Sequence, residues 1–133
     1  MKIEIKKVSE RQIRAHELMR LYRDAGWWPE RDSTDIEKLL IEGCAVGAWY
    51  NDELVGFARA VTDGIFRAYI EDVVVDHRFQ NSGIGKELVA LLLEDLSHID
   101  VISLFCEEDL IPFYEKNHFK ASKSQFVMHR KVK

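Results

Sequence analysis

Residues 73 to 96, VVVDHRFQNSGIGKELVALLLEDL, change their pattern halfway along. The first part is a β-branched run typical of a buried strand, and the last part spaces its leucines as a helix does. Between them, Gln80 to Lys86 contains two glycines and no packing pattern. Glycines between a strand and a helix let the backbone approach a ligand, and the first N–H groups of a helix have no partner inside it. The stretch therefore predicts an anion-binding loop, most often one for phosphate.

Two common phosphate loops do not fit this stretch. A P-loop requires glycine at the position of Gln80 and a serine or threonine where Glu87 stands. The dinucleotide-binding fingerprint requires a third glycine at Leu88. On the loop alone, a plain strand-to-helix turn with a glycine N-cap stays open as the alternative.

The composition limits the kind of protein. A chain of 133 residues fits a single domain over 1–133 with a real core, and 47% hydrophobic with 32% charged residues is typical of a folded globular protein. The net charge of −4 argues against a nucleic-acid partner. Cys44 and Cys106 have no paired spacing, and no segment resembles a signal peptide or a membrane span. We therefore expect a cytoplasmic protein with no membrane partner, and the scattered histidines indicate no metal site.

The remaining chain divides into strands and helices in a mixed order. Alternation at Ile3 and Ile5 predicts a first strand, and Ser9 is a candidate N-cap for a helix that Gly26 ends. Asn51-Asp52 is a strong hairpin signal. The other expected elements are a helix from Ser33 or Thr34, strands over 44–50, 53–62, 66–76 and 101–105, a helix over 110–117 and a closing strand over 121–132. This order predicts an α/β or α+β domain built around a central mixed sheet.

The glycine stretch resembles a known motif once its context is included. The pattern Gln80-x-x-Gly83-x-Gly85, after VVVDHRF and before an amphipathic helix, resembles motif A of the GNAT N-acetyltransferase superfamily. One helix and one strand later, CEEDLIPFYEKNHF at residues 106–119 is similar to a second GNAT segment, especially that of arylalkylamine N-acetyltransferases. The segment LVGFARAVTDG is similar to the third strand of the family. The resemblance covers nearly the whole chain and implies the GNAT fold, with a mixed, mostly antiparallel sheet flanked by helices.

The resemblance implies acetyl-CoA as the co-substrate and no metal. The strand of Val73, Val74 and Val75 would pair through its backbone with the pantetheine arm. Arg78 and Lys86 either add charge at the phosphate end or are solvated surface residues. The loop that would hold the pyrophosphate consists of Gln80, Asn81, Ser82, Gly83, Ile84, Gly85 and Lys86.

Acetyl transfer to an amine requires a proton donor for the departing thiolate. A phenol with a pKa of about 10 suits a thiol with a pKa of about 8.5. Tyr114 falls on the tyrosine of the family's FY pair, and we predict it as the general acid. The alternative is that Tyr114 only packs beside Phe113.

The base that takes the amine proton is predicted on the strand before the loop. Strand alternation would place Glu71 on one face and Asp72 on the other. Acidic residues inside a β-branched run are unfavourable unless they are exposed, paired or functional. Glu71 falls where arylalkylamine enzymes have a histidine, so it is the first candidate, directly or through water. Asp72 is the second candidate, with an ion pair as its alternative role. The carbonyl would be polarised by a backbone N–H of this strand.

Three residues near Tyr114 depart from expectation or invite another mechanism. A covalent role for Cys106 is disfavoured because Glu107 and Glu108 would not stabilise a thiolate, so a buried structural thiol is predicted. Glu107 replaces the asparagine that often contacts pantetheine. His118 replaces a glycine, and Asn117 is expected to take the left-handed turn instead.

The acceptor is predicted to be the primary amine of a small molecule. Trp27 and Trp28 lie among acids in the loop between the first two helices, a combination that suits a cationic amine. Arg59 and Asp63 are further candidates, with packing or turn formation as alternatives. Two rival functions stay open: acetylation of protein lysines or N-termini, and a non-catalytic acyl-CoA-binding module. Family resemblance also implies the capacity to form a homodimer.

Overall fold

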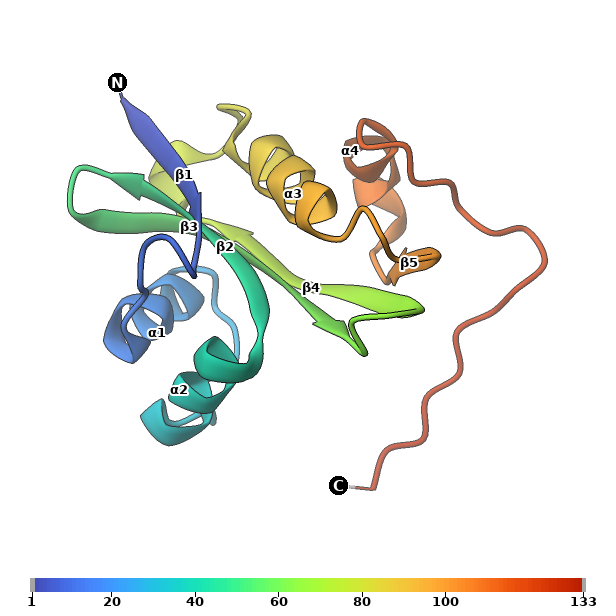
Figure 1. The fold of residues 1–133 in the computed structure, drawn as a ribbon, viewed down its shortest axis with the longest axis horizontal. Helices are drawn as coiled ribbons and strands as arrows, with labels where there is room; N and C mark the ends of the chain where they lie inside the picture. Colours follow the sequence, from blue (N-terminus) through green and yellow to red (C-terminus); the bar gives the residue numbers. More distant parts are fainter. Residues whose placement is uncertain (1, 133) are drawn as a thin grey trace.

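The fold is a five-stranded sheet with helices on both faces (Figure 1). The computed structural model describes residues 2–132. Strands follow the order β1-β2-β3-β4-β5; the first four pair antiparallel, and β5 pairs parallel with β4. The predicted mixed, mostly antiparallel sheet is therefore confirmed. The elements are β1 (Ile3–Lys7), α1 (Ala15–Asp24), α2 (Ser33–Glu42), β2 (Cys44–Tyr50), β3 (Glu53–Thr62), β4 (Arg67–Val75), η1 (His77–Phe79), α3 (Ile84–Asp95), β5 (Val101–Leu104), η2 (Glu108–Leu110) and α4 (Ile111–Glu115).

Each face of the sheet carries its own hydrophobic core. Helix α3 packs on one face through Leu88 and Leu92, while α1 and α2 cover the other through Leu18, Leu21 and Ile36. The helices meet the sheet closely at Gly56, where an added Cβ would lie 2.9 Å from Leu88 Cδ1. Leucines at helical spacing in α3 therefore pack as the sequence pattern predicted.

A β-bulge at Asp72 interrupts the alternation of β4. Ala68 and Ile70 belong to the core under α3, whereas Val74 belongs to the core under α1 and α2. The pairing register with β3 shifts at this level, and Asp72 has a φ of 55°. A bulge places two residues opposite one on the neighbouring strand. The side chains beyond it therefore point to the opposite face of the sheet from the one that simple alternation predicts. The prediction that Glu71 and Asp72 lie on opposite faces is wrong, because one guanidinium, that of Arg59, binds both.

The first helix begins later than expected. Ser9 does not cap it; α1 starts at Ala15, and Glu17 accepts the backbone N–H of Arg14 at 2.9 Å. Gly26 ends the helix region with a φ of 74°, as predicted. The next helix starts at Ser33, as predicted, after the carboxylate of Asp32 accepts the N–H of Asp35 at 2.9 Å. Side-chain capping by acids thus decides both helix starts.

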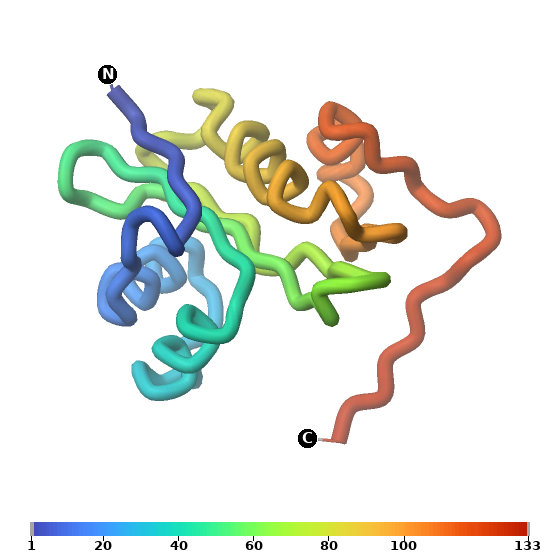
Figure 2. Tube along the Cα trace, in the orientation of Figure 1, coloured from blue at the N-terminus to red at the C-terminus, as the bar shows by residue number. Residues whose placement is uncertain are grey.

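The predicted closing strand over 121–132 is not formed. This tail follows an extended path that bows outward (Figure 2), and it pairs with no strand of the described sheet. Phe126 is 86% exposed and Met128 92% exposed. Alternating apolar and polar residues predict a strand, but they do not supply the neighbouring strand with which its backbone must hydrogen-bond. An extended segment without such a neighbour is not stabilised by its alternation alone. Within residues 2–132, no helix has the length and apolar character needed to cross a membrane.

Candidate active site

A cavity opens where β4 and β5 separate. The two strands pair from Arg67 opposite Val101 to Ile70 opposite Leu104, and their pairing ends there. The cavity beyond has a volume of about 520 Å³. Six residues predicted as catalytic, cofactor-binding or substrate-binding meet in it, although their roles stay predictions. These six residues are Trp27, Trp28, Glu71, Asp72, Val73 and Tyr114.

The two acidic residues of β4 share one arginine beneath the cavity. Arg59 Nε donates to Asp72 Oδ2 at 2.8 Å, and its Nη2 donates to Glu71 Oε2 at 2.8 Å. Burial alone would lower the pKa of Arg59, but the hydrogen bond and charge of Asp72 outweigh it and raise that pKa. Arg59 is therefore a largely buried cation, with its side chain 14% exposed, that holds the two carboxylates and is absent from the cavity lining.

The surroundings of the two carboxylates differ strongly. The Asp72 side chain is 3% exposed and also accepts from Tyr22 Oη at 3.1 Å and Arg31 Nη1 at 3.4 Å. The Glu71 side chain is 32% exposed and has Arg59 as its partner. The three donors already occupy much of the Asp72 carboxylate's capacity to accept hydrogen bonds from a ligand. Glu71 is the carboxylate that solvent and a ligand can reach.

Tyr22 and Arg31 complete this network and were not predicted from the sequence. Tyr22 lies on the apolar face of α1, so its pattern indicated packing alone. Burial, followed by the charge of Asp72, raises the pKa of its hydroxyl. Arg31 also stacks over Trp28, with Cζ 4.0 Å from the ring centroid. One feature of the sequence could have indicated this role for Tyr22. A tyrosine on an otherwise apolar helical face becomes buried, and its hydroxyl then needs a hydrogen-bond partner.

Tyr114 stands on α4 at the side of the cavity opposite β4. Its ring packs against Phe113 and Phe119, with centroids 4.8 and 6.1 Å away. Burial, followed by the nearby Cys106, raises the pKa of Tyr114 to about 12. The phenol therefore keeps its proton throughout the neutral range and presents an O–H donor.

Cys106 also lines the cavity, which corrects the prediction of a buried structural thiol. Its side chain is exposed at the end of β5. Partial burial, followed by the charge of Asp109, raises the pKa of the Cys106 thiol. The exposure arises because β5 ends at Leu104 and the chain leaves the sheet there. The thiol is accessible yet protonated at neutral pH, so the geometry gives no support to a nucleophilic cysteine.

The glycine loop joins β4 to α3 through a left-handed turn. Asn81 has a φ of 61°, and Gly83, the N-cap of α3, has a φ of 87°. Helix geometry leaves the N–H groups of Ile84, Gly85 and Lys86 without an acceptor inside the helix. Gly85 faces Phe113, whose ring lies 3.1 Å from where a Cβ would stand. The glycine loop thus ends in a helix N-terminus with an exposed, side-chain-poor approach, and its role in anion binding stays a prediction.

Three other loop side chains are already engaged by the protein. Gln80 Nε2 donates to the Val75 carbonyl at 3.1 Å, and Ser82 Oγ donates to the Phe79 carbonyl. Arg78 binds Asp76 and Glu53, so its charge is neutralised locally. Between the two basic candidates, Lys86 is the one exposed at the helix start.

The end of α4, the helix that carries Tyr114, is tied to this loop by an asparagine. Asn117 Nδ2 donates to the Lys86 carbonyl at 3.3 Å. His118 itself takes the left-handed conformation, with a φ of 69°, so the expectation that Asn117 would do so is wrong. Asn117 instead uses its side chain to connect the end of α4 with the first turn of α3.

Asp63 lies outside the cavity. Its carboxylate accepts the backbone N–H groups of Ile65, Phe66 and Arg67 at 2.8–3.1 Å in the turn before β4. These bonds lower its pKa. The structure therefore gives Asp63 the turn-forming role that was the alternative to acceptor binding.

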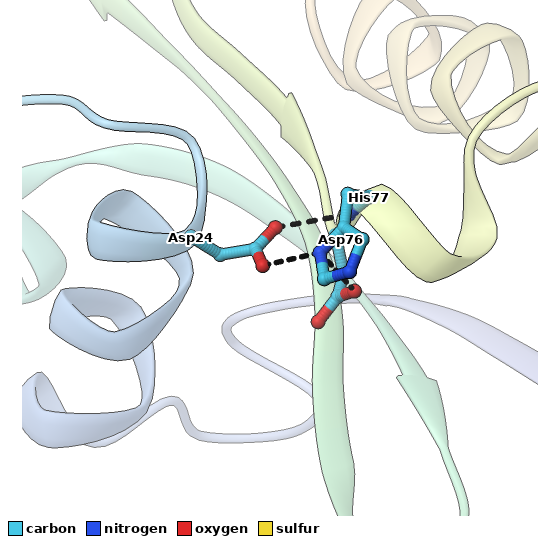
Figure 3. Close-up of side chains that lie close together, drawn as sticks. All are labelled: Asp24, Asp76 and His77. Atoms are coloured by element: carbon cyan, nitrogen blue, oxygen red, sulfur yellow. Dashed lines mark hydrogen bonds and ion pairs between the residues drawn. The ribbon is translucent and has the colours of Figure 1, made fainter.

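Asp24, Asp76 and His77 form a separate polar cluster (Figure 3). His77 Nδ1 lies 2.5 Å from Asp24 Oδ1, and the His77 N–H donates to the same carboxylate at 2.9 Å. Asp76 is 1% exposed and is held by Arg78 and Arg20. Because arginines occupy Asp76, the cluster serves as a joint between α1 and the start of the glycine loop.

A mixed sheet that opens between β4 and β5, with a glycine turn leading into α3, defines the acyl-CoA N-acyltransferase fold. Residues 12–119 match the family described as Acetyltransferase (GNAT) family, and the chain belongs to that family.

Relatives and solved structures agree with this assignment. The uncharacterized N-acetyltransferase ycf52 of Pyropia yezoensis is 36% identical over 132 residues, covering 89% of this chain and 73% of that protein. The histone acetyltransferase TAP1 of Glycine max is 40% identical over 108 residues, which are 71% of this chain and 44% of that protein. A probable acetyltransferase of unknown function from meticillin-resistant Staphylococcus aureus superposes with a TM-score of 0.84 at 20% identity, covering 98% of this chain and 100% of that one. At that identity, the structural likeness shows the fold alone.

Proposed function

We propose that this chain transfers the acetyl group of acetyl-CoA to the primary amine of a small molecule by direct attack in a ternary complex. The observation that carries the proposal is the single cavity between β4 and β5. It brings together a reachable carboxylate, Glu71, and a protonated phenol, Tyr114, beside the two tryptophans at its rim. An amine and a thioester placed between these groups would have a proton acceptor on one side and a donor on the other.

The glycine loop supports a nucleotide-containing donor. The N–H groups of Ile84, Gly85 and Lys86 at the start of α3 suit a pyrophosphate, and Lys86 adds a positive charge. The backbone of β4 beyond Ile70 is free of pairing with β5, so an extended pantetheine arm could bind along Val73 to Val75 as an added strand. Acetyl-CoA has both chemical features, and these residues would orient its thioester toward the cavity.

The first proton is assigned to Glu71. A primary ammonium has a pKa of about 10.4 and cannot attack a carbonyl until it loses a proton. Glu71, directly or through a water molecule, accepts that proton, and the neutral nitrogen then forms a bond to the thioester carbon. Arg59 fixes the orientation of the Glu71 carboxylate from below.

The second proton is assigned to Tyr114. When the carbon–sulfur bond breaks, its electron pair remains on sulfur, and the resulting thiolate requires a hydrogen-bond donor or a proton. A pKa of about 12 keeps the Tyr114 hydroxyl protonated, although it also makes the phenol a weaker acid than free tyrosine. Tyr114 therefore first donates a hydrogen bond to the developing thiolate and then supplies a proton as the thiol leaves. The phenolate regains a proton from solvent.

Asp72 is proposed as a positioning residue. It is buried under three donors and holds Arg59, Tyr22 and Arg31 in place. The bulge that it forms turns Glu71 into the same network and leaves the following valines free for the donor. Asp72 therefore fixes the geometry of the base without accepting the amine proton.

The cavity favours a small cationic acceptor. Its volume of about 520 Å³ lies in the range typical of small-molecule sites. Trp27 and Trp28 offer aromatic faces, and Glu71 offers a negative charge, which together suit an alkylammonium group.

Acetylation of protein lysines is the second candidate, because the Glycine max relative is named a histone acetyltransferase. A lysine side chain presents the same alkylammonium group. A peptide, however, needs an open groove on both sides of that group, whereas Trp27 and Trp28 supply one wall of this cavity. A non-catalytic acyl-CoA-binding module would have no use for Tyr114.

A screen for acetyl-CoA-dependent thiol release tests the proposal. Arylalkylamines, polyamines, amino acids and lysine peptides are compared at equal concentration, and products are identified by mass. We expect the highest kcat/KM for a small primary amine. Preference for lysine peptides would favour the second candidate. CoA binding without turnover on any acceptor would favour the non-catalytic module.

A further inference from the structure

The loop between α1 and α2 carries a tryptophan in an unusual backbone conformation. Trp28 has a φ of 52°, is 39% exposed and lines the cavity between β4 and β5. A positive φ is uncommon for a bulky side chain, and it persists only where the surrounding structure holds it. Gly26, with a φ of 74°, adopts a similar conformation without a side chain to strain. The conformation of Trp28 therefore needs a contact that stabilises it.

Arg31 supplies that contact from within the same loop. Its Cζ lies 4.0 Å from the centroid of the Trp28 ring, and its backbone N–H donates to the Trp28 carbonyl at 3.1 Å. A planar guanidinium stacks on an aromatic face and is attracted by the electron density of that face. Trp28 lines the cavity and Arg31 does not, so the guanidinium covers a part of the ring that lies outside the cavity. Arg31 therefore supports Trp28 without competing with an acceptor for space.

The same guanidinium also binds the bulge in β4. Arg31 Nη1 donates to Asp72 Oδ2 at 3.4 Å, and the side chains of Arg31 and Asp72 are 27% and 3% exposed. Asp72 is fixed in turn by Arg59, which also binds Glu71. The Arg31 side chain thus connects Trp28 on one wall of the cavity with the strand that carries the proposed base.

The neighbouring tryptophan is anchored in a different way. The N–H of Trp27 donates to the Tyr22 carbonyl at 2.9 Å, and the two rings lie 6.4 Å apart. Within residues 2–132, the Trp28 ring makes no aromatic or cation–π contact besides the one with Arg31. Loss of the Arg31 side chain should therefore release Trp28 while Trp27 keeps its place on α1.

We infer that Arg31 is a positioning residue that holds Trp28 in place as a wall of the cavity and thereby sets how well an acceptor amine binds. The inference rests on the proposed function, since it assigns Trp28 to the acceptor's side of the cavity. Because a guanidinium already covers part of the ring, a second cation on the same ring is disfavoured by charge repulsion. The ammonium of the acceptor is thus directed to Glu71, and Trp28 contacts the apolar part of the acceptor.

The mobility of the Trp28 ring tests the positioning role without any acceptor. In a Trp27→Phe background, time-resolved fluorescence anisotropy separates Trp28 from Trp49, which is 1% exposed and rigidly packed. Arg31→Ala should increase the amplitude of the fast local motion. Arg31→Lys keeps the charge but loses the planar stack, so it should give an intermediate amplitude. Arg23→Ala removes an exposed arginine on α1 outside this network and is the matched control. Equal amplitudes in Arg31→Ala and its parent would overturn the inference.

Acceptor kinetics test the consequence for binding. Arg31→Ala should raise the KM of the best small amine about tenfold and leave the KM of acetyl-CoA unchanged, because residues 80–86 lie outside these contacts. If Arg31 acts through Trp28, then Arg31→Ala should add less than about twofold in a Trp28→Ala background.

Two kinetic outcomes would contradict the inference. A lower acceptor KM in Arg31→Ala would mean that Arg31 occupies the acceptor's own cation site. Fully additive effects of the Arg31 and Trp28 substitutions would mean that Arg31 supports Asp72 alone. Absence of turnover by the wild-type chain would contradict the proposed function instead, and the anisotropy measurement would still decide whether Arg31 holds Trp28.

Discussion

Tyr22 donates its hydroxyl hydrogen to Asp72 Oδ2 across 3.1 Å, joining α1 to the bulge in β4. The bond connects the element that positions the tryptophan loop with the strand that carries Glu71. Both residues are nearly excluded from solvent, since Tyr22 is 2% exposed and the Asp72 side chain 3%. This buried contact, together with the bond from Arg31 to the same carboxylate, thus holds the two halves of the candidate active site together.

Tyr22→Phe should reduce the free energy of unfolding by about 1.5 kcal/mol, since the buried carboxylate loses one of its three donors. Chemical denaturation measures this loss. Tyr50→Phe removes a hydroxyl that makes no hydrogen bond to the described part of the chain, and it should change stability by much less. Equal effects of the two substitutions would mean that the Tyr22–Asp72 bond contributes little.

Glu71→Gln should lower kcat/KM at neutral pH while leaving the melting temperature nearly unchanged. The loss should shrink as the pH approaches the acceptor amine's pKa of about 10, because more of the amine then arrives neutral. A pH–rate profile from pH 6 to 10 measures this. A deficit that is constant across that range would show that Glu71 only pairs with Arg59.

Asp72→Asn should instead act mainly on stability. Removing a buried charge that Arg59, Arg31 and Tyr22 surround should cost about 3 kcal/mol of folding free energy. The accompanying rate loss should be independent of pH, because Asp72 is not the proton acceptor. If Asp72→Asn gave the pH-dependent deficit and Glu71→Gln the constant one, the base would be Asp72.

Tyr114→Phe should lower kcat by roughly 10²–10⁴-fold, since only the hydroxyl is removed. The ring contacts with Phe113 and Phe119 persist, so CoA affinity measured by calorimetry should stay unchanged. Turnover at the wild-type rate with a good acceptor would make Tyr114 a packing residue.

Gly83→Asp should abolish measurable CoA binding while the protein stays folded. The glycine has a φ of 87°, and an aspartate there would bring negative charge to the helix N-terminus. Gly64→Asp provides the control, because Gly64 has a φ of 78° in an exposed turn far from the loop and bears the same backbone strain. Unchanged CoA affinity in Gly83→Asp would remove the phosphate assignment.

Stability should fall in acid partly through Asp76. The hydrogen bond from Arg78 holds the pKa of Asp76 below its ordinary value, despite burial. A depressed folded-state pKa stabilises the fold above the unfolded value of about 3.9, and that contribution is lost as the pH falls below it. Asp76→Asn should flatten the decline of unfolding free energy between about pH 5 and 2. Asp52→Asn, at an exposed hairpin position, should leave the decline unchanged.

Local patterns in the sequence determined most of the fold. The β-branched run, the two glycines and the leucine spacing after Gly85 were enough to predict β4, the loop and α3, because each signal comes from neighbouring residues. The Asn51-Asp52 turn likewise placed the β2–β3 hairpin. Tyr114 and Glu71 became candidates through the resemblance of their segments to those of the GNAT family.

Tertiary structure decided what depends on distant partners. The bulge at Asp72 forms where β4 meets β3 and binds Arg59, so alternation within β4 alone put Glu71 and Asp72 on opposite faces. Tyr22 and Arg31 joined the site only when α1 packed on the sheet. The tail over 121–132 has a strand's alternation, yet a strand also needs a neighbour to hydrogen-bond with, and no local pattern says where that neighbour is. These features depend on hydrogen bonds and burial between residues far apart in the chain, which no local sequence pattern specifies.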